Sequence, residues 1–428
     1  MMTRYPSQSR VHVEHFQRRL DGDEIIIGLP EVGSFVALPP EAVELLDLLA
    51  SGKRVHEAEA LYEAKHGERP ATEELLEALE ARGFVQPAQG PSGASAVAPA
   101  QASTALPVRY HFARFPARLA RLLFGRVALC GHALIIALGV LALLWSPSLV
   151  GTPEALAPSE HFSLTLLALV GLSLFTTFVH ELAHLVAARA VGVSSRLGFG
   201  NRLWMPVAET DMSGLWLVER RARYLPLLAG PLVDLTSAAA LVLVLLAGAR
   251  GWVPLSPLIQ HLCQATFYLY LFRLLWQCYF FVRTDFYYAL ATLFGCKSLM
   301  QDAEAWLRHR LWRLLGRASK PSPLEVLPLR EARFVRLYAG VWLLGRVAAF
   351  AVLLTLQFPF LFRFVSGLVH VLTAGGSTRA EVAEALLISS LSVAGFVLGM
   401  VLWLRSLLHS HLRRRVARGA LPSPLEQR

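Results

Sequence analysis

Residues 165–186 read TLLALVGLSLFTTFVHELAHLV, an apolar run that ends with two histidines and a glutamate among its last seven residues. A helix of about 20 predominantly apolar residues is long enough to cross the hydrocarbon core of a bilayer. Ionisable side chains are costly inside such a segment. His180, Glu181 and His184 are therefore predicted to serve a function.

Similar apolar runs recur only after residue 126, in a chain that is 54% hydrophobic and 17% charged. This composition excludes an ordinary soluble protein and predicts a mainly α fold. We expect a small soluble α+β domain followed by a polytopic membrane domain with about six spans. The predicted spans are roughly 127–147, 163–189, 225–249, 258–282, 338–361 and 383–405.

Low-complexity sequence and charge divide the chain into four predicted parts. The stretch QPAQGPSGASAVAPAQASTALP is rich in Pro, Ala, Ser and Gly, which is typical of a flexible linker. We therefore expect a soluble domain at 1–86, a linker at 87–107, a membrane domain at 108–415 and a tail at 416–428.

The distribution of basic residues predicts how the chain is oriented. Residues 1–90 hold 9 Lys and Arg against 16 Asp and Glu, whereas the remainder is strongly basic. The basic residues flank alternate spans, and basic loops face the cytoplasm, so both termini are expected there. The excess of positive charge is thus assigned to loops near membrane lipid, and nucleic acid is not expected as a partner. In this orientation His180 lies near the cytoplasmic side of the bilayer.

The HELAH sequence has the spacing of a metal site. On a helix, His180 and His184 lie one turn apart on the same face and can bind one divalent ion, Zn²⁺ being the expected metal. Glu181 is placed to act as a general base toward water. The alternative is an inert polar cluster buried between helices.

A catalytic zinc usually has three protein ligands, and the third is expected from another span. Asp285 follows the predicted span 258–282 and should lie at the same depth as His180. The alternative for Asp285 is pairing with Arg283. Rival ligands are Asp234, in the predicted span 225–249, and Glu209 and Asp211, in the preceding loop.

Other polar residues in apolar segments have simpler interpretations. Arg273 is expected to pair with a neighbouring helix, with a role in a water path or in substrate binding as the alternative, and Arg346 to extend toward the cytoplasmic interface. His132 and His370 are not predicted as ligands. The stretch LGFGNRLWMPVAETDMSGLWLVER predicts a surface hairpin, which either pairs with an extended substrate or simply connects two spans.

The order of these motifs resembles the site-2 protease family of intramembrane zinc metallopeptidases, and more closely its bacterial branch of peptide zinc metalloproteases. HELAH ends one span, AGP lies in the next, and RTD follows the one after. The resemblance implies that His180, His184 and Asp285 bind zinc and that Glu181 is the base. The family's pattern NPxxRxDG is altered here, because the Asn, the Pro and the Gly after Asp285 are absent.

The first 86 residues predict short strands and three short helices that end at glycines, a small winged-helix-like domain. GSFVALPPEAVELLDLL, the following pair of helices and the closing GFV resemble PqqD-like domains, which hold the leader peptides of ribosomally made, modified peptides. The alternative is a domain that only docks on its own membrane half.

Together these features predict an intramembrane zinc metalloprotease that acts on a peptide or a membrane segment near the cytoplasmic face. Its substrate is expected to be the precursor of a modified peptide, in maturation or export. One alternative is a non-hydrolytic membrane receptor, export or immunity protein that keeps a metal site. The other is a regulatory intramembrane protease. The substrate-binding residues are not predicted.

Overall fold

The computed structural model describes residues 5–87, 115–153, 162–296, 298–316, 322–373 and 378–419, and most of these residues are helical. Nearly all of the predicted linker, and the tail from residue 420, lie outside the described residues. The chain divides into two compact units. The first consists of Met1–Phe115, Ala188–Arg196 and Asp211–Arg223, and the second of Pro116–Ala187, Leu197–Thr210 and Tyr224–Arg428.

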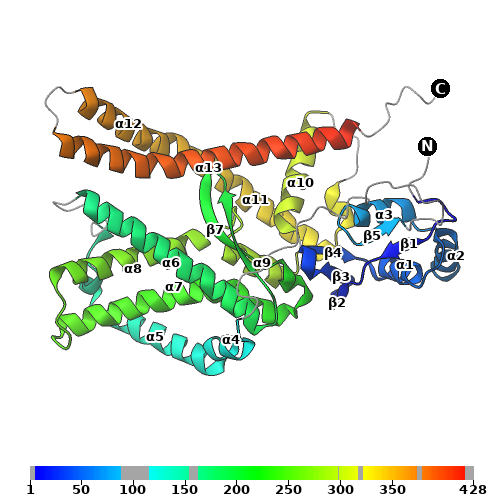
Figure 1. Cartoon of the computed structure of the whole chain (residues 1–428), viewed down its shortest axis with the longest axis horizontal. Coiled ribbons are helices and arrows are strands. Elements are labelled where there is room, and N and C mark those ends of the chain that lie inside the picture. The colour runs from blue at the N-terminus through cyan, green and yellow to red at the C-terminus, as the bar shows by residue number, and fades with distance from the viewer. Residues whose placement is uncertain are drawn as a thin grey trace, which may run out of the picture. The chain divides into compact units, whose positions relative to one another are not determined.

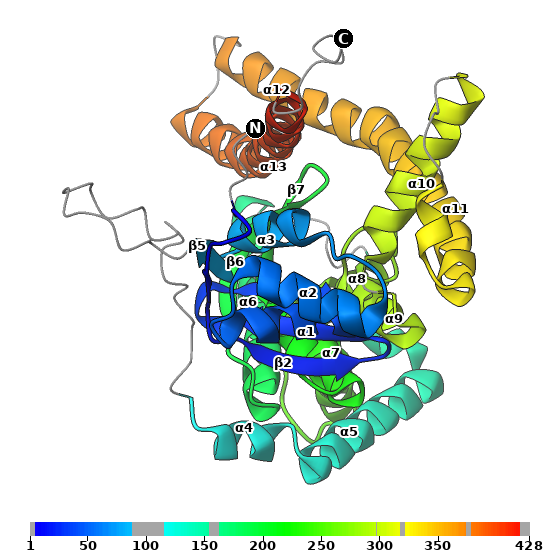
Figure 2. The ribbon, with the colours of Figure 1, turned by 90° about the vertical axis from the view of Figure 1, so that its right-hand side faces the viewer.

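The N-terminal part contains strands and three helices, as the sequence predicts, but its assignment to the winged-helix type stays a prediction. Its elements are β1 (Val11–Val13), β2 (Gln17–Asp21), β3 (Glu24–Leu29), β4 (Ser34–Leu38), α1 (Pro40–Ala50), α2 (Val55–His66), α3 (Thr72–Glu80) and β5 (Val85–Pro87). Strands β2, β3 and β4 form one antiparallel sheet, and β1 pairs with β5. The helices α1 and α2 lie side by side (Figure 2).

The apolar positions of these short elements form one core. Ile27, Leu46, Leu76 and Phe84 come from β3, α1, α3 and the segment before β5, and all four are fully buried. The turn between β2 and β3 contains Gly22 at a φ of +68°, which glycine adopts without steric cost.

Five helical segments among the described residues are long and apolar enough to cross a membrane, which supports a membrane protein. These candidate spans are Ala117–Trp145, Leu166–Ala190, Arg220–Ala249, Leu329–Thr373 and Val382–Arg405. The helices that form them are α4 (Ala117–Leu123), α5 (Arg126–Trp145), α6 (Phe162–Ala190), α7 (Arg220–Ala249), α11 (Leu329–Val352), α12 (Phe358–Thr373) and α13 (Arg379–Gly419). Figure 1 shows α12 and α13 running alongside each other.

The fourth predicted span, 258–282, forms a helix over most of its length, α8 (Pro257–Gln277), but α8 is not among the five. Its sequence includes Gln260, His261, Gln264 and Arg273, which lower its hydropathy. The predicted count of six spans and the predicted orientation therefore stay predictions. The helix of the fifth predicted span continues past its predicted end at residue 361, because α11 joins α12 through a π-helical segment at Leu353–Gln357.

The predicted hairpin between the second and third spans is confirmed. Strands β6 (Arg196–Arg202) and β7 (Met205–Asp211) pair with each other, and Leu203 in their turn has a φ of +57°. The next residue, Trp204, is buried, and its Nε1 donates a hydrogen bond of 2.7 Å to Gln357 Oε1. A Cβ at Gly399 of α13 would lie 1.8 Å from the Trp204 carbonyl oxygen, so only glycine allows this close approach.

Two further helices, α9 (Asp285–Phe294) and α10 (Leu299–Leu314), lie between α8 and α11 in the chain. Helix α10 packs along α11, with Leu299, Met300 and Ala303 buried against Val335 and Ala339. Helix α9 begins only a few residues after α8 ends. This short break determines where Asp285 lies.

Candidate metal centre

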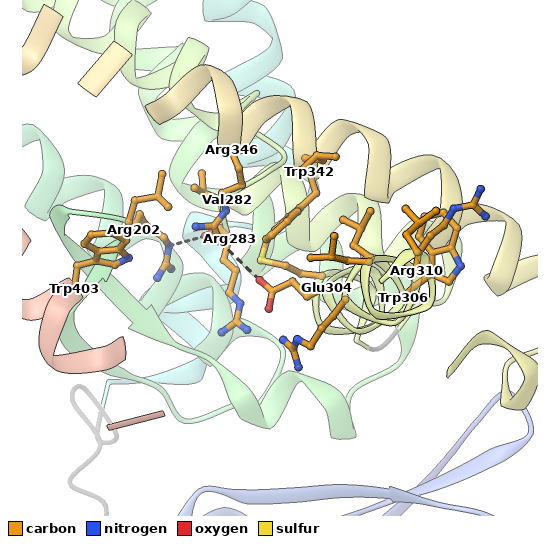
Figure 3. Close-up of a pocket in the computed structure, with 16 residues that line it drawn as sticks. Arg202, Val282, Arg283, Glu304, Trp306, Arg310, Trp342, Arg346 and Trp403 are labelled. Carbon is orange, nitrogen blue, oxygen red and sulfur yellow. Dashed lines mark hydrogen bonds and ion pairs between the residues drawn. The ribbon is translucent and has the colours of Figure 1, made fainter. Parts of the chain in front are cut away.

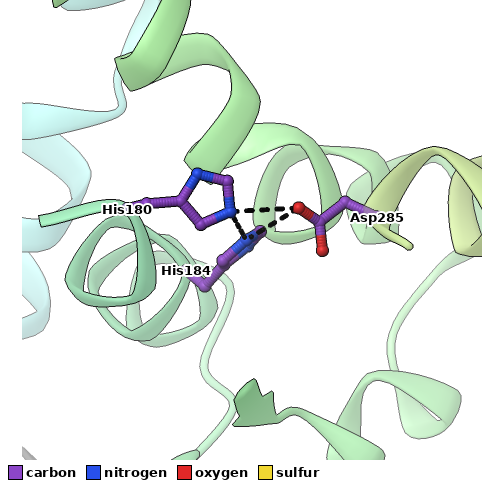
Figure 4. A group of neighbouring side chains, drawn as sticks. All are labelled: His180, His184 and Asp285. Carbon is purple, nitrogen blue, oxygen red and sulfur yellow. Dashed lines mark hydrogen bonds and ion pairs between the residues drawn. The ribbon is translucent and has the colours of Figure 1, made fainter. Parts of the chain in front are cut away.

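Three predicted ligands converge on one point. His180 and His184 leave α6 one turn apart, and their Nε2 atoms lie 3.2 Å from each other. Asp285, the first residue of α9, brings its Oδ2 to 3.1 Å from His180 Nε2 and 3.3 Å from His184 Nε2 (Figure 4). Both imidazoles are almost completely buried, with exposed fractions of 4% and 2%. Residues 105 positions apart are thus brought together as the sequence predicts.

The break between α8 and α9, residues 278–284, contains neither proline nor glycine. Thr284 caps α9 by accepting a hydrogen bond from the Tyr287 N–H, and its hydroxyl donates to the Gln277 carbonyl oxygen at 2.9 Å. The Gln277 side-chain oxygen accepts a bond of 3.0 Å from the Asp285 N–H. Gln277 and Thr284 therefore fix the backbone that presents Asp285.

Asp234, a predicted rival ligand, contacts the far side of His180 instead. Its Oδ2 lies 2.8 Å from His180 Nδ1, and its side chain is 1% exposed. Its Oδ1 accepts a bond of 3.1 Å from Arg273, which also donates to Thr176 Oγ1. Arg273 thus pairs with a neighbouring helix, as predicted. A carboxylate on the second nitrogen of a ligating histidine is a common feature of metal sites, because it orients the ring.

The outer hydrogen bonds define which nitrogens face the centre. His184 Nδ1 donates to the carbonyl oxygen of Pro226 at 2.7 Å, since a carbonyl can only accept. The carboxylate of Asp234 likewise accepts a hydrogen bond from His180 Nδ1. When Nδ1 carries the only proton of each ring, each imidazole turns an Nε2 lone pair toward the other and toward the Asp285 carboxylate. Three acceptors that meet in this way require a cation or an added proton between them.

Gly230 provides the space in which the two imidazoles meet. A Cβ at this position of α7 would lie 2.4 Å from His184 Nε2 and 2.5 Å from His180 Nε2. No side chain fits at those distances. Two prolines, Pro226 and Pro231, lie inside the same stretch of α7, and proline disturbs regular helical hydrogen bonding. Gly230 of the AGP sequence thus lies directly against both imidazoles.

The donor set fits a zinc ion. Its two imidazole nitrogens and one carboxylate oxygen all lie within 4.8 Å of one another. Tetrahedral zinc with bonds of about 2.0–2.1 Å places its ligand atoms about 3.3 Å apart, which is close to the separations between these three atoms. Burial raises the pKa of Asp285, but the positive charge of protonated His184 and His180 lowers it more, so its pKa lies below the ordinary value. Asp285 is thus a carboxylate whether protons or a metal cation occupy the space between the three side chains.

Glu181, the predicted base, is buried and held by the hairpin. Its Oε2 accepts a hydrogen bond of 2.7 Å from the Thr210 hydroxyl on β7, and the same hydroxyl lies 3.2 Å from the Glu181 carbonyl oxygen. A carboxylate next to a metal ligand can accept a proton from water, provided that its orientation is fixed. Thr210 fixes this orientation.

The other predicted candidates lie in separate interactions. Glu209 pairs with Arg202, and Asp211 pairs with Arg196 and Ser213, so neither belongs to the group of three ligands. His132, which is not predicted as a ligand, contacts the Thr236 hydroxyl. Sequence reasoning gave no role to four residues of the centre: Thr176, Thr210, Pro226 and Gln277. The AGP sequence that contains Gly230 and Pro231 was recognised as a motif, but the sequence did not predict that it lies beside the imidazoles.

No protein-family profile matches the chain, and neither a curated protein nor a solved structure is significantly similar to it.

Proposed function

We propose that the protein is a membrane-embedded zinc metallopeptidase that hydrolyses a peptide bond in a peptide or membrane-segment substrate near the cytoplasmic face. The observation that supports this proposal is the convergence of His180, His184 and Asp285. Glu181 lies beside His180 on α6. The same observation favours catalysis over a purely structural metal, because Glu181 is not needed to bind the ion.

In the proposed reaction, His180, His184 and Asp285 hold the ion. When bound, zinc supplies Lewis-acid polarisation of a peptide carbonyl and lowers the pKa of water. Glu181 removes a proton from the attacking water, whose oxygen forms a bond to the carbonyl carbon. Glu181 then gives this proton to the leaving nitrogen as the C–N bond breaks. Thr210 keeps the carboxylate of Glu181 oriented during both transfers.

The N-terminal part is proposed to recruit the substrate, for which a modified-peptide precursor is the expected class. Its β2–β3–β4 sheet and three helices are compatible with pairing an added peptide strand. A linker between recruitment and catalysis raises the local concentration of a bound substrate. The β6–β7 hairpin, which carries Thr210, is a second strand edge beside the proposed centre.

Zinc content tests the ligand set. Full-length protein purified in detergent is compared with the His184→Ala, Asp285→Ala and Glu181→Gln variants, and Asp302→Ala serves as a carboxylate control outside the centre. We expect about one zinc per chain in the wild type, Glu181→Gln and Asp302→Ala, and a large loss in the other two. Undiminished zinc in Asp285→Ala would exclude the proposed ligand set.

Cleavage of a proteome-derived peptide library, read by mass spectrometry, tests the reaction itself. The wild type should produce cleavage products that Glu181→Gln does not, although both hold zinc. If the wild type and Glu181→Gln hold equal amounts of zinc but the wild type cleaves no peptide, the result would favour the non-hydrolytic receptor, export or immunity protein. Cleavage limited to a membrane-bound regulator would favour the regulatory protease.

A further inference from the structure

A cavity of about 900 Å³ lies within the second unit (Figure 3). Its walls come from the β6 end of the hairpin, the segment before α9, and helices α10, α11 and α13. The three ligands of the proposed metal centre and Glu181 do not line it. The proposed peptidase reaction therefore does not use this cavity.

The lining of the cavity is strongly cationic. Five arginines face a single carboxylate, that of Glu304. Arg202 is paired with Glu209 outside the lining, and Arg346 Nη2 lies 3.9 Å from Glu304 Oε1. Among the residues that the structure describes, Arg283, Arg308 and Arg310 have no carboxylate within ion-pairing distance. An anion entering the cavity would meet uncompensated positive charge.

Two buried donors in the cavity have no hydrogen-bond partner in the described structure. They are Trp342 Nε1 and Arg346 Nε, one helical turn apart on α11. The guanidinium of Arg346 also lies over the Trp342 ring, at 4.9 Å from its centroid. Buried N–H groups are nearly always satisfied in folded proteins, so these two indicate a missing acceptor.

The rest of the lining is apolar and aromatic. Met300, Leu307 and Leu311 of α10 face the cavity together with Leu343 of α11. Helix α10 is itself rich in Arg, Trp and Leu, a composition typical of helices at a membrane interface, and α11 begins a candidate membrane span. A ligand with only a charged group would leave this apolar wall uncovered.

We propose that this cavity binds an anionic phospholipid. The phosphate oxygens accept hydrogen bonds from Arg346 Nε and Trp342 Nε1 and interact with Arg283 and Arg308, while an acyl chain lies along the leucines of α10. Basic pockets beside membrane helices bind anionic headgroups in this way. This inference goes beyond the proposed peptidase activity and does not depend on it.

Quenching of tryptophan fluorescence by brominated lipid tests the proposal, since Trp306, Trp342 and Trp403 line the cavity. Full-length protein in a neutral detergent is titrated with brominated phosphatidylglycerol or with phosphatidylcholine bearing the same chains. We expect saturable quenching by phosphatidylglycerol, with at least tenfold weaker binding of phosphatidylcholine. Trp342→Phe should lose part of the quenching.

Charge variants identify the site. Arg308 lies at an exposed position of α10, and Arg308→Gln should weaken phosphatidylglycerol binding relative to the wild type. The double variant Arg308→Gln/Arg346→Gln should weaken it further, by at least tenfold in total. Arg313→Gln is the matched control, because Arg313 lies on the same helix but does not line the cavity. A helical circular dichroism spectrum and a single elution peak verify that each variant is folded.

Three outcomes would overturn the proposal. If Arg308→Gln and the double variant bind phosphatidylglycerol as tightly as the wild type, the lipid binds elsewhere. If the wild type binds phosphatidylglycerol and phosphatidylcholine equally, the site does not recognise charge. Inorganic phosphate added at millimolar concentration distinguishes the source of the anion. If phosphate alone displaces the lipid completely, the natural ligand is a soluble phosphate compound and the lipid assignment is wrong.

Discussion

His180 Nδ1 lies 2.8 Å from Asp234 Oδ2, and this hydrogen bond joins the helix that carries two proposed metal ligands to the helix that carries Gly230. Asp234 thereby determines both the orientation of the His180 ring and the nitrogen that carries its proton. We expect Asp234→Asn to weaken zinc binding by roughly 10–100-fold without abolishing it, the usual effect of losing such a partner. Competition with a fluorescent chelator measures the affinity, and an unchanged Kd would contradict the assignment.

Arg273 is expected to be needed for folding rather than for zinc binding itself. In Arg273→Met, the buried Asp234 carboxylate loses its cationic partner, which costs roughly 3–5 kcal/mol in comparable buried pairs. Thermal unfolding in detergent should show a clear loss of stability. The double variant Arg273→Met/Asp234→Asn should lose less stability than the two single variants combined, because the unpaired charge is removed. Strict additivity would show that the two side chains are not coupled.

Gly230→Ala should disrupt the metal centre more than any other single methyl group added to α6 or α7. The new Cβ would lie within 2.5 Å of both Nε2 atoms, so the imidazoles must move apart. Zinc content should fall by at least tenfold. The control is Gly171→Ala in α6, where a Cβ meets no atom within 4 Å, and this variant should retain its zinc. Full zinc occupancy in Gly230→Ala would mean that the ring positions described above are wrong.

Asp211 predicts a pH dependence of stability. Burial raises its pKa, but hydrogen bonds from Ser213 and the pairing with Arg196 lower it more, so the pKa in the folded protein lies below the ordinary value near 3.9. A group with a depressed pKa stabilises the fold above its unfolded pKa, and this contribution disappears as the pH falls through the folded pKa. The Tm of wild type should therefore exceed that of Asp211→Asn at pH 7, and the difference should shrink below pH 4. A constant difference from pH 7 to pH 3 would refute this.

The local features of the centre could be predicted from the sequence, whereas its supporting contacts could not. The spacing of His180 and His184 follows from helical geometry, and the position of Asp285 followed from the order of the apolar runs. Thr210 carries no such signal, because a threonine in a strand is ordinary until the strand is seen beside Glu181. The sequence predicts Asp234 only as a rival ligand, because it does not show which carboxylate contacts Nδ1 of an imidazole and which contacts Nε2.

The predicted fold has a similar limit. Apolar length predicts individual spans well, but α8 combines helical length with three glutamines, a histidine and an arginine, so its placement relative to the membrane depends on what surrounds it. The cavity between α10 and α11 had no signal beyond scattered arginines and tryptophans. These residues are spread over more than 200 positions, and only the packing of α10 along α11 brings most of them together.

The ion pair between Arg273 and Asp234 also governs the valence of the cation that suits the centre. Glu181, Asp234 and Asp285, taken as carboxylates, and the single guanidinium of Arg273 leave two negative charges when both imidazoles are neutral. A doubly charged ion makes the whole group electrically neutral, which is the least costly state for a buried cluster in an apolar bundle. Sodium or potassium would leave one charge uncompensated. Loss of Arg273 would leave one negative charge that a doubly charged ion does not balance, which is the same unpaired charge that destabilises the fold.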